Sequence, residues 1–231
     1  MPETIYTIPI NEAYENIIET GENACPFCKL KNKLEEDELE IILGASMMEP
    51  DIRIRTNELG FCPNHFSKML RFSKRLPLAL ILESHLDEVK GNYSRKGLIK
   101  PSAEKIADAI SKLSESCYVC SRIEYNEKRL ISNAVYMWQS DYDFRKKYKS
   151  ASMLCLPHTA LLLKCAKHEL NKRDYADFAE ITVEITGKCL ADTKEDVSTF
   201  VRSYDYRYAG DPLSEKEKLS VETAIRLLSG E

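Results

Sequence analysis

The chain of 231 residues lacks any long hydrophobic run. Its richest apolar stretch, residues 76–82, is seven residues long and is followed at once by Glu83, whereas a membrane-spanning helix needs about 20 apolar residues. Residues 1–17 carry acidic rather than basic side chains and show none of the apolar region typical of a secretory signal. We therefore expect a cytoplasmic protein without membrane attachment.

Glycine and proline are scarce, and neither sign of charge dominates. With 8 Gly, 9 Pro and 43% hydrophobic residues, the composition excludes collagen-like, low-complexity and disordered chains. A chain of this size buries roughly 70% of its unfolded surface, so a core can form without disulfides. The net charge of -4 argues against a protein that mainly coats a polyanion. We expect a protein partner rather than a nucleic acid; the sequence leaves the oligomeric state open.

What the chain does have is eight cysteines, which in a reducing compartment are more often metal ligands or core residues than disulfides. Six of them, with two histidines, form a pattern that occurs twice: Cys-x-x-Cys, then 33 or 34 residues, then Cys-x-x-His. Equivalent cysteines lie 92 or 93 residues apart, which indicates an internal duplication. These eight residues are Cys25, Cys28, Cys62, His65, Cys117, Cys120, Cys155 and His158.

Two donors separated by two residues can reach one zinc ion from a single helical turn, and two such pairs complete a tetrahedron. We therefore predict two zinc ions per chain, each held by three cysteines and one histidine. With four protein ligands each ion is saturated, which is typical of structural rather than catalytic zinc. The alternatives are an iron-sulfur cluster on the same donors and buried free thiols.

The sequence permits two ways of pairing the donors. Within one repeat, the 33 residues after Cys28 can form a helix and return, so that each ion pins the base of its own helical hairpin. We expect this intra-repeat pairing, which gives two pseudo-repeated helical hairpins each pinned by one site. The alternative is the crossed arrangement, in which Cys25 and Cys28 share an ion with Cys155 and His158.

Apolar residues recur every three or four positions, which predicts an all-α fold. Proline or serine marks helix starts at Pro50, Pro63, Ser102 and Ser214. The one extended segment is expected at residues 5–10, because Pro9 disfavours a helix.

We expect three regions that together form one compact unit. Repeat 1 is residues 1–92, repeat 2 is residues 101–193, and a C-terminal helical extension is residues 194–231. A connection rich in Gly, Pro and basic residues, 91–101, separates the repeats.

The chain resembles a bacterial family of uncharacterised proteins, a domain of unknown function, over nearly its whole length. The motifs that carry the resemblance are YTIPINEAYE, CPFC, MEPDIRIRTNELGFCPNH, LALILESHL, YDYR and LLSG. Pro50 departs from the pattern, where an acidic residue is expected. The resemblance implies a bacterial cytoplasmic protein and supports the eight ligands position by position. It brings no activity.

The same motifs contain polar residues for which helix caps and ion pairs are the favoured interpretation, with a ligand pocket between the repeats as the alternative. These are Glu49, Asp51, Arg53, Arg55, Thr56, Asn57, Asp205, Tyr206 and Arg207.

The remaining candidate residues have simpler interpretations. Cys165 lies seven residues after His158, about 10 Å along a helix, so it cannot share the same ion. We expect Cys165 and Cys189 to be core residues and His85 to lie on a polar helix surface. Basic residues at 145–149 alternate with aromatic ones, a mixture that nucleic-acid surfaces use, although at helical spacing the aromatic rings are expected to pack inward.

Taken together, these features predict a non-enzymatic, zinc-organised helical scaffold, adaptor or regulatory binding protein. Three alternatives come from other classes: a thiol or iron-sulfur redox sensor, an enzyme with a cleft between the repeats, and a nucleic-acid-binding protein.

Overall fold

The computed structural model describes residues 7–93, 102–208 and 212–230. These residues form twelve α-helices and two short 3-10 helices, and they contain no strand. The all-α prediction is confirmed. None of these helices is both long enough and apolar enough to cross a membrane.

The helices succeed one another along the chain with short connections. In order they are α1 (Thr7–Thr20), α2 (Pro26–Ile42), η2 (Ala45–Met48), α3 (Pro50–Leu59), α4 (Pro63–Arg71), α5 (Arg75–Tyr93), α6 (Ala103–Glu115), α7 (Tyr118–Ser140), α8 (Tyr142–Lys149), α9 (Leu156–Glu169), α10 (Lys172–Arg202), η3 (Tyr206–Tyr208), α11 (Glu215–Lys218) and α12 (Ser220–Ser229).

The helix starts expected from the sequence are present, with one correction near the N-terminus. α3 and α4 begin at their prolines, and Ser102 and Ser214 cap α6 and α11. The expected extended segment at residues 5–10 is wrong for its described part, because α1 begins at Thr7. Pro9 lies in the first turn of that helix, where its missing N–H costs no intrahelical hydrogen bond. Residues 94–101 of the expected connection lie outside the described residues.

The chain forms two compact units. Unit 1 consists of Met1–Asn32 and Glu127–Glu231, and unit 2 consists of Lys33–Asn126. α2 and α7 each contribute residues to both units. The units cut across the sequence repeat, and α10 continues unbroken past the expected boundary at 193.

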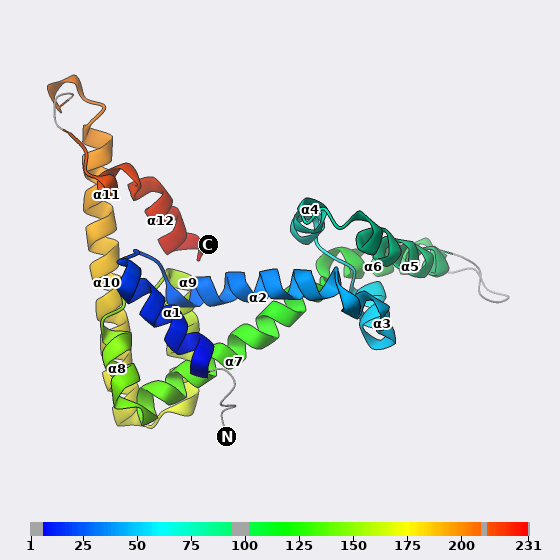
Figure 1. Cartoon of the computed structure of the whole chain (residues 1–231), viewed down its shortest axis with the longest axis horizontal. Coiled ribbons are helices and arrows are strands. Elements are labelled where there is room, and N and C mark those ends of the chain that lie inside the picture. Colours follow the sequence, from blue (N-terminus) through cyan, green and yellow to red (C-terminus); the bar gives the residue numbers. More distant parts are fainter. Residues whose placement is uncertain (1–6, 94–101, 209–211, 231) are drawn as a thin grey trace. The chain divides into compact units, whose positions relative to one another are not determined.

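In unit 1, α8, α9, α11 and α12 lie along the 31-residue helix α10 (Figure 1). Its core is an aromatic cluster in which neighbouring ring centroids lie 5.1 to 6.4 Å apart. The cluster consists of Tyr14, Phe27, Trp138, Phe144, Tyr148 and Phe178. Edge-to-face and tilted pairs of this kind each add about 1 kcal/mol beyond area burial. Unit 1 therefore has a core of its own.

In unit 2, aliphatic residues of α2 and α5 pack with the start of α7 around Phe61 and Met69. Gly60, which follows the last residue of α3, lies next to the start of α7, and its carbonyl accepts a hydrogen bond from the Tyr118 amide at 2.9 Å. Cys117 is itself part of this core cluster. Unit 2 thus buries the first cysteine of the second Cys-x-x-Cys motif in its own core.

We expect Gly60→Ala to destabilise unit 2 by about 2–3 kcal/mol. Gly60 has φ +58°, and an added Cβ would lie 3.0 Å from the buried ring of His85. Gly91→Ala is the matched control, since its Cβ meets nothing within 4 Å in α5 and replaces a helical glycine. Thermal unfolding should show a lower Tm for the first variant only; equal Tm values would contradict the strain at Gly60.

Candidate metal centres

All four cysteine-containing motifs lie at helix N-termini in the same way. Cys25, Cys62, Cys117 and Cys155 each immediately precede the first residue of α2, α4, α7 and α9. The second donor of each motif follows three residues later, in the first helical turn. The partial positive charge of a helix N-terminus favours a thiolate there. The helix N-terminus therefore favours the thiolate, the form of cysteine that binds metal, in each motif.

The structure brings the donors together in the crossed arrangement. Centre 1 combines Cys25 and Cys28 of the first repeat with Cys155 and His158 of the second. Centre 2 combines the remaining four donors: Cys62, His65, Cys117 and Cys120. Neither centre closes the hairpin of a single repeat, so the expected intra-repeat pairing does not occur. All eight predicted donors belong to one of these two groups.

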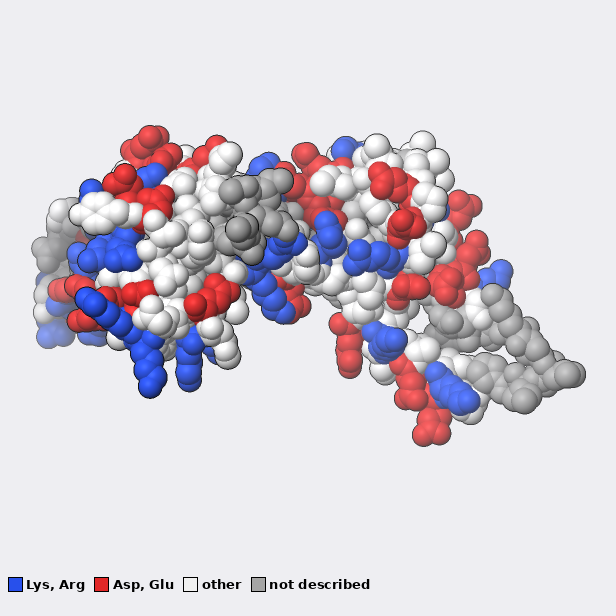
Figure 2. Space-filling model, turned by 90° about the horizontal axis from the view of Figure 1, so that it is seen from below, with Lys and Arg blue, Asp and Glu red and all other residues white. Residues whose placement is uncertain are grey.

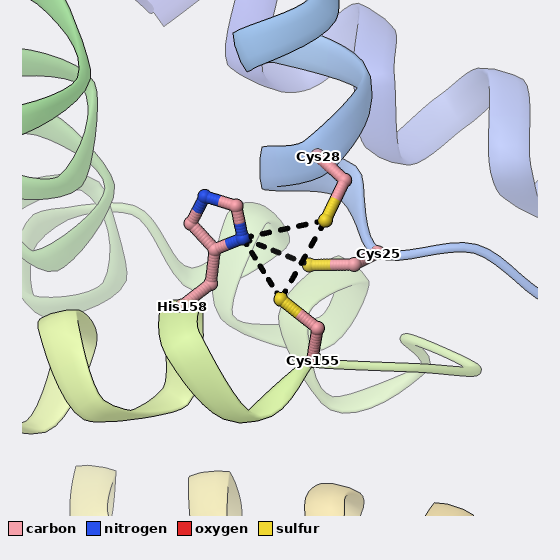
Figure 3. A group of neighbouring side chains, drawn as sticks. All are labelled: Cys25, Cys28, Cys155 and His158. Atoms are coloured by element: carbon pink, nitrogen blue, oxygen red, sulfur yellow. Dashed lines mark hydrogen bonds between the residues drawn. The ribbon is translucent and has the colours of Figure 1, made fainter. Parts of the chain in front are cut away.

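In centre 1 the four donor atoms surround a common point (Figure 3). The Nδ1 atom of His158 lies 2.9 Å from the Sγ of Cys155, 3.4 Å from that of Cys28 and 3.7 Å from that of Cys25. The sulfurs of Cys28 and Cys155 are 3.5 Å apart. A zinc tetrahedron has edges of about 3.6 Å between nitrogen and sulfur and about 3.8 Å between sulfurs. The spacing suits one small ion.

Centre 2 has similar spacing but is more open. His65 Nδ1 lies 3.1 to 3.4 Å from the three sulfurs, and the sulfurs of Cys62 and Cys120 are 3.9 Å apart. Cys120 is exposed and Cys62 half-buried, whereas all four donors of centre 1 are buried. The two centres thus differ in access to solvent and not in donor type.

The Nε2 atom of each histidine, which does not face the sulfurs, contacts a glutamate carboxylate. The Nε2 atom of His158 lies 3.0 Å from a carboxylate oxygen of Glu127, and Nε2 of His65 lies 2.8 Å from one of Glu35. The ring N–H on Nε2 donates to the carboxylate, and Nδ1 is the ring nitrogen that faces the sulfurs. A carboxylate behind a ligating histidine is the usual support of protein metal sites.

The two glutamates are also paired with lysines. Lys68 donates to Glu35 at 2.5 Å, and Lys31 lies 3.7 Å from Glu127. Both carboxylates are largely buried, with 15% of the side chain exposed. Burial raises the pKa of Glu127, but its hydrogen bond with His158 and the nearby Lys31 ammonium hold that pKa below its ordinary value.

Glu35 and Glu127 were not among the residues predicted from the sequence. A signal for them exists, because each follows the second cysteine of its Cys-x-x-Cys motif by seven residues, after Cys28 and after Cys120. Within a helix, seven residues return to nearly the same face. The repeat therefore contains five equivalent functional positions, and not four.

Hydrogen bonds in centre 1 shift its proton equilibria. Burial raises the pKa of the Cys25 thiol, but hydrogen bonds from Cys155, Cys28 and His158 outweigh it and hold the pKa well below its ordinary value. Burial lowers the pKa of His158, whereas hydrogen bonds to Cys155, Cys25 and Glu127 raise it to about 11. Without an ion, a thiolate therefore faces a protonated imidazole, and His158 must lose its Nδ1 proton when it binds a metal ion.

Centre 2 shows the same tendency at Cys62. Burial raises the pKa of this thiol, yet backbone N–H groups and the neighbouring thiols lower it overall. Burial lowers the pKa of His65 in spite of its hydrogen bond to Glu35. Burial and the neighbouring Cys117 and Cys62 raise the pKa of Cys120 to about 12. A neutral imidazole beside a thiolate is the ligand state that a metal ion requires.

The residues that the sequence singled out for a ligand pocket belong to two different units. Glu49, Asp51, Arg53, Arg55, Thr56 and Asn57 lie on or next to α3 in unit 2, and Asp205, Tyr206 and Arg207 lie in unit 1. Several have local partners. The Asn57 side chain accepts from Ser84 at 2.9 Å, and Arg207 forms a 2.6 Å ion pair with Asp205. The pocket stays a prediction.

A cavity of about 620 Å³ lies in unit 1, beside α10. Its charged lining comes from Lys149, Glu184, Lys188, Asp192, Asp196 and Lys216. None of the residues expected to bind a ligand lines this cavity.

Cys165 and Cys189 belong to neither donor group of the described residues, in agreement with the spacing argument. Cys189 is buried and Cys165 half-buried. His85 was expected on a surface helix, but it is buried, and its Nδ1 lies 3.0 Å from the Asn57 carbonyl oxygen. It is a core histidine.

The basic segment at 145–149 has its neighbouring aromatic residues turned largely inward. Phe144 and Tyr148 are fully buried, and Lys147 pairs with Glu15 at 2.5 Å. On the face shown in Figure 2, acidic and basic side chains are interspersed. These observations give no support to the nucleic-acid alternative.

A family model of DUF6062, described as a family of unknown function, matches residues 1–231. No curated protein matches the chain. No solved structure matches it either.

Proposed function

Since the chain belongs to DUF6062, a family of unknown function, we propose its role from the two centres: it is a non-enzymatic helical scaffold organised by two structural zinc ions, acting through a protein partner. The observation that carries the proposal is the donor set. Each centre supplies three sulfurs and one nitrogen within 4.8 Å of one another. Four protein donors leave a tetrahedral ion no position for a substrate or a reactive water.

Zinc is favoured over an iron-sulfur cluster by the spacing of the donors. Sulfur–sulfur separations of 3.5 and 3.9 Å correspond to the edges of one tetrahedral ion. A cluster of several irons would hold its ligands farther apart. The supporting glutamates, Glu35 and Glu127, also match the outer shell of histidine-ligated zinc.

The crossed pairing supports a scaffolding role. Each centre joins a Cys-x-x-Cys motif of one repeat to a Cys-x-x-His motif of the other, so each ion ties together chain segments about 130 residues apart in centre 1 and about 55 in centre 2. Such links constrain the unfolded chain and define a fixed surface on each unit. A partner would recognise that surface.

Elemental analysis of protein purified anaerobically tests the proposal. We expect two zinc ions per chain, with one lost in Cys28→Ser and the other in Cys120→Ser. Cys165→Ser is the matched control, because Cys165 lies outside both donor groups, and it should retain both ions. A substoichiometric metal content, or visible absorbance from an iron-sulfur cluster, would overturn the zinc scaffold.

A second candidate function is favoured by one observation, the accessibility of centre 2. Its Cys62 and Cys120 sulfurs lie 3.9 Å apart, and Cys120 is exposed. Hydrogen peroxide could take two electrons from these two thiolates, which would form a disulfide while the hydrogen peroxide, with two protons, becomes two water molecules. Centre 2 would then release its ion and report oxidation.

A further inference from the structure

Each of the two long helices α2 and α7 serves both centres. α2 follows Cys25 and includes Cys28, both ligands of centre 1, and it also carries Glu35, which holds the His65 ligand of centre 2. α7 follows Cys117 and includes Cys120, which are ligands of centre 2. The same helix carries Glu127, which holds the histidine of centre 1. The arrangement is reciprocal.

The spacing along the helices is the same in both cases. Glu35 follows Cys28 by seven residues, and Glu127 follows Cys120 by seven. Seven residues of α-helix rise about 10 Å and turn to within about 20° of the same face. One helical segment of two turns therefore separates the ligands of one centre from the supporting carboxylate of the other.

We propose that α2 and α7 couple the two centres, so that each bound zinc ion raises the affinity of the other centre for its ion. This inference rests on the proposed zinc sites and adds their mutual regulation. It requires only the continuity of each helix and the contacts within each unit.

Helix nucleation supplies the coupling. Forming a first helical turn is the costly step, and further turns add readily once it exists. An ion at centre 1 fixes Cys25 and Cys28 and so organises the first turn of α2. Propagation through two more turns then places Glu35 behind His65. An ion at centre 2 acts on α7 and Glu127 in the same way.

The coupling should be measurable. Loss of the partner behind a metal-ligating histidine typically lowers metal affinity about 10- to 100-fold. If each ion secures much of that support for the other, the coupling factor is on the order of 10. By thermodynamic linkage, an ion at centre 1 raises the affinity of centre 2 by the same factor as an ion at centre 2 raises that of centre 1.

Zinc titration against a competing chelator, followed by native mass spectrometry of the full chain, tests the inference. Cys28→Ser gives the affinity of centre 2 alone, and Cys120→Ser gives that of centre 1 alone. The product of the two constants measured on the unsubstituted chain should exceed the product of these single-centre constants about 10-fold. A ratio of one overturns the coupling.

Glu35→Gln provides a second variant that keeps all eight ligands. Because Glu35→Gln also weakens centre 2 directly, its coupling is read from the same ratio of products, with Cys28→Ser and Cys120→Ser each added to Glu35→Gln for the single-centre constants. We expect this ratio to fall toward one. Glu36→Gln, an exposed neighbour in the same helix, should leave the ratio near 10. If Glu35→Gln also leaves the ratio near 10, α2 carries no coupling.

The outcomes separate the two proposals. Two zinc ions that bind independently overturn the coupling and leave the zinc scaffold intact. A chain that binds no zinc at either centre overturns both.

Discussion

Removing both zinc ions is expected to lower the Tm of the chain by roughly 15–30 °C. An ion present at a thousand times its Kd stabilises the folded state by about 4 kcal/mol, and two such ions contribute about 8. For a chain of 150–250 residues, 1 kcal/mol shifts Tm by about 2–4 °C. The loss should be larger in unit 2, where Cys117 belongs to the hydrophobic core, than in unit 1 with its aromatic cluster.

Differential scanning calorimetry with and without a zinc chelator measures this effect. Adding back zinc should restore the Tm, and helical circular dichroism at low temperature should persist in part because unit 1 keeps its aromatic core. The Cys165→Ser variant should respond as the unsubstituted chain does. A Tm that does not change after both ions are shown to be removed would mean that the centres do not stabilise the fold.

Centre 2 is expected to lose its ion, and to be alkylated, at least about tenfold faster than centre 1. Cys120 is exposed and Cys62 half-buried. In centre 1, by contrast, Cys25 is 2% and Cys155 0% exposed. A chelator or a thiol reagent must reach a sulfur to displace the metal, so access decides the order. Once centre 2 is empty, the proposed coupling predicts that centre 1 loses its ion more readily.

Timed treatment with N-ethylmaleimide in the presence of a chelator, followed by peptide mass spectrometry, resolves the order by residue. Peptides that contain Cys62, Cys117 or Cys120 should be modified first. The same experiment with a peroxide tests the redox candidate, for which a disulfide in centre 2 should form before any in centre 1. Simultaneous modification of both sets would contradict the role of access.

The crossed pairing changes how the duplication is understood. Each repeat carries a complete set of donors, yet the structure completes each centre with donors from both repeats. Neither donor group consists of residues from one repeat alone.

Much of this protein follows from the amino-acid sequence. The duplicated spacing and the ligand chemistry of cysteine and histidine predicted all eight donors, since a Cys-x-x-Cys or Cys-x-x-His pair is local and its geometry is set by one helical turn. Apolar periodicity predicted the all-α fold for the same reason, because helices depend on contacts three and four residues apart. The extended segment predicted around Pro9 was wrong, because a helix tolerates proline in its first turn but not in its interior.

Other features were decided only by the tertiary structure. A spacer of 33 or 34 residues can lead a chain back to its own repeat or on to the other one, so local geometry could not select between the two pairings. The same holds for the contact of His85 with Asn57 and for the contacts of Glu35 and Glu127 with the two histidines. Each of these contacts joins residues about 30 positions apart in the sequence. Such contacts depend on how helices pack, which no local pattern specifies. The sequence by itself determined which residues are suited to bind a metal ion, and the packing of the helices determined which of them form one donor group.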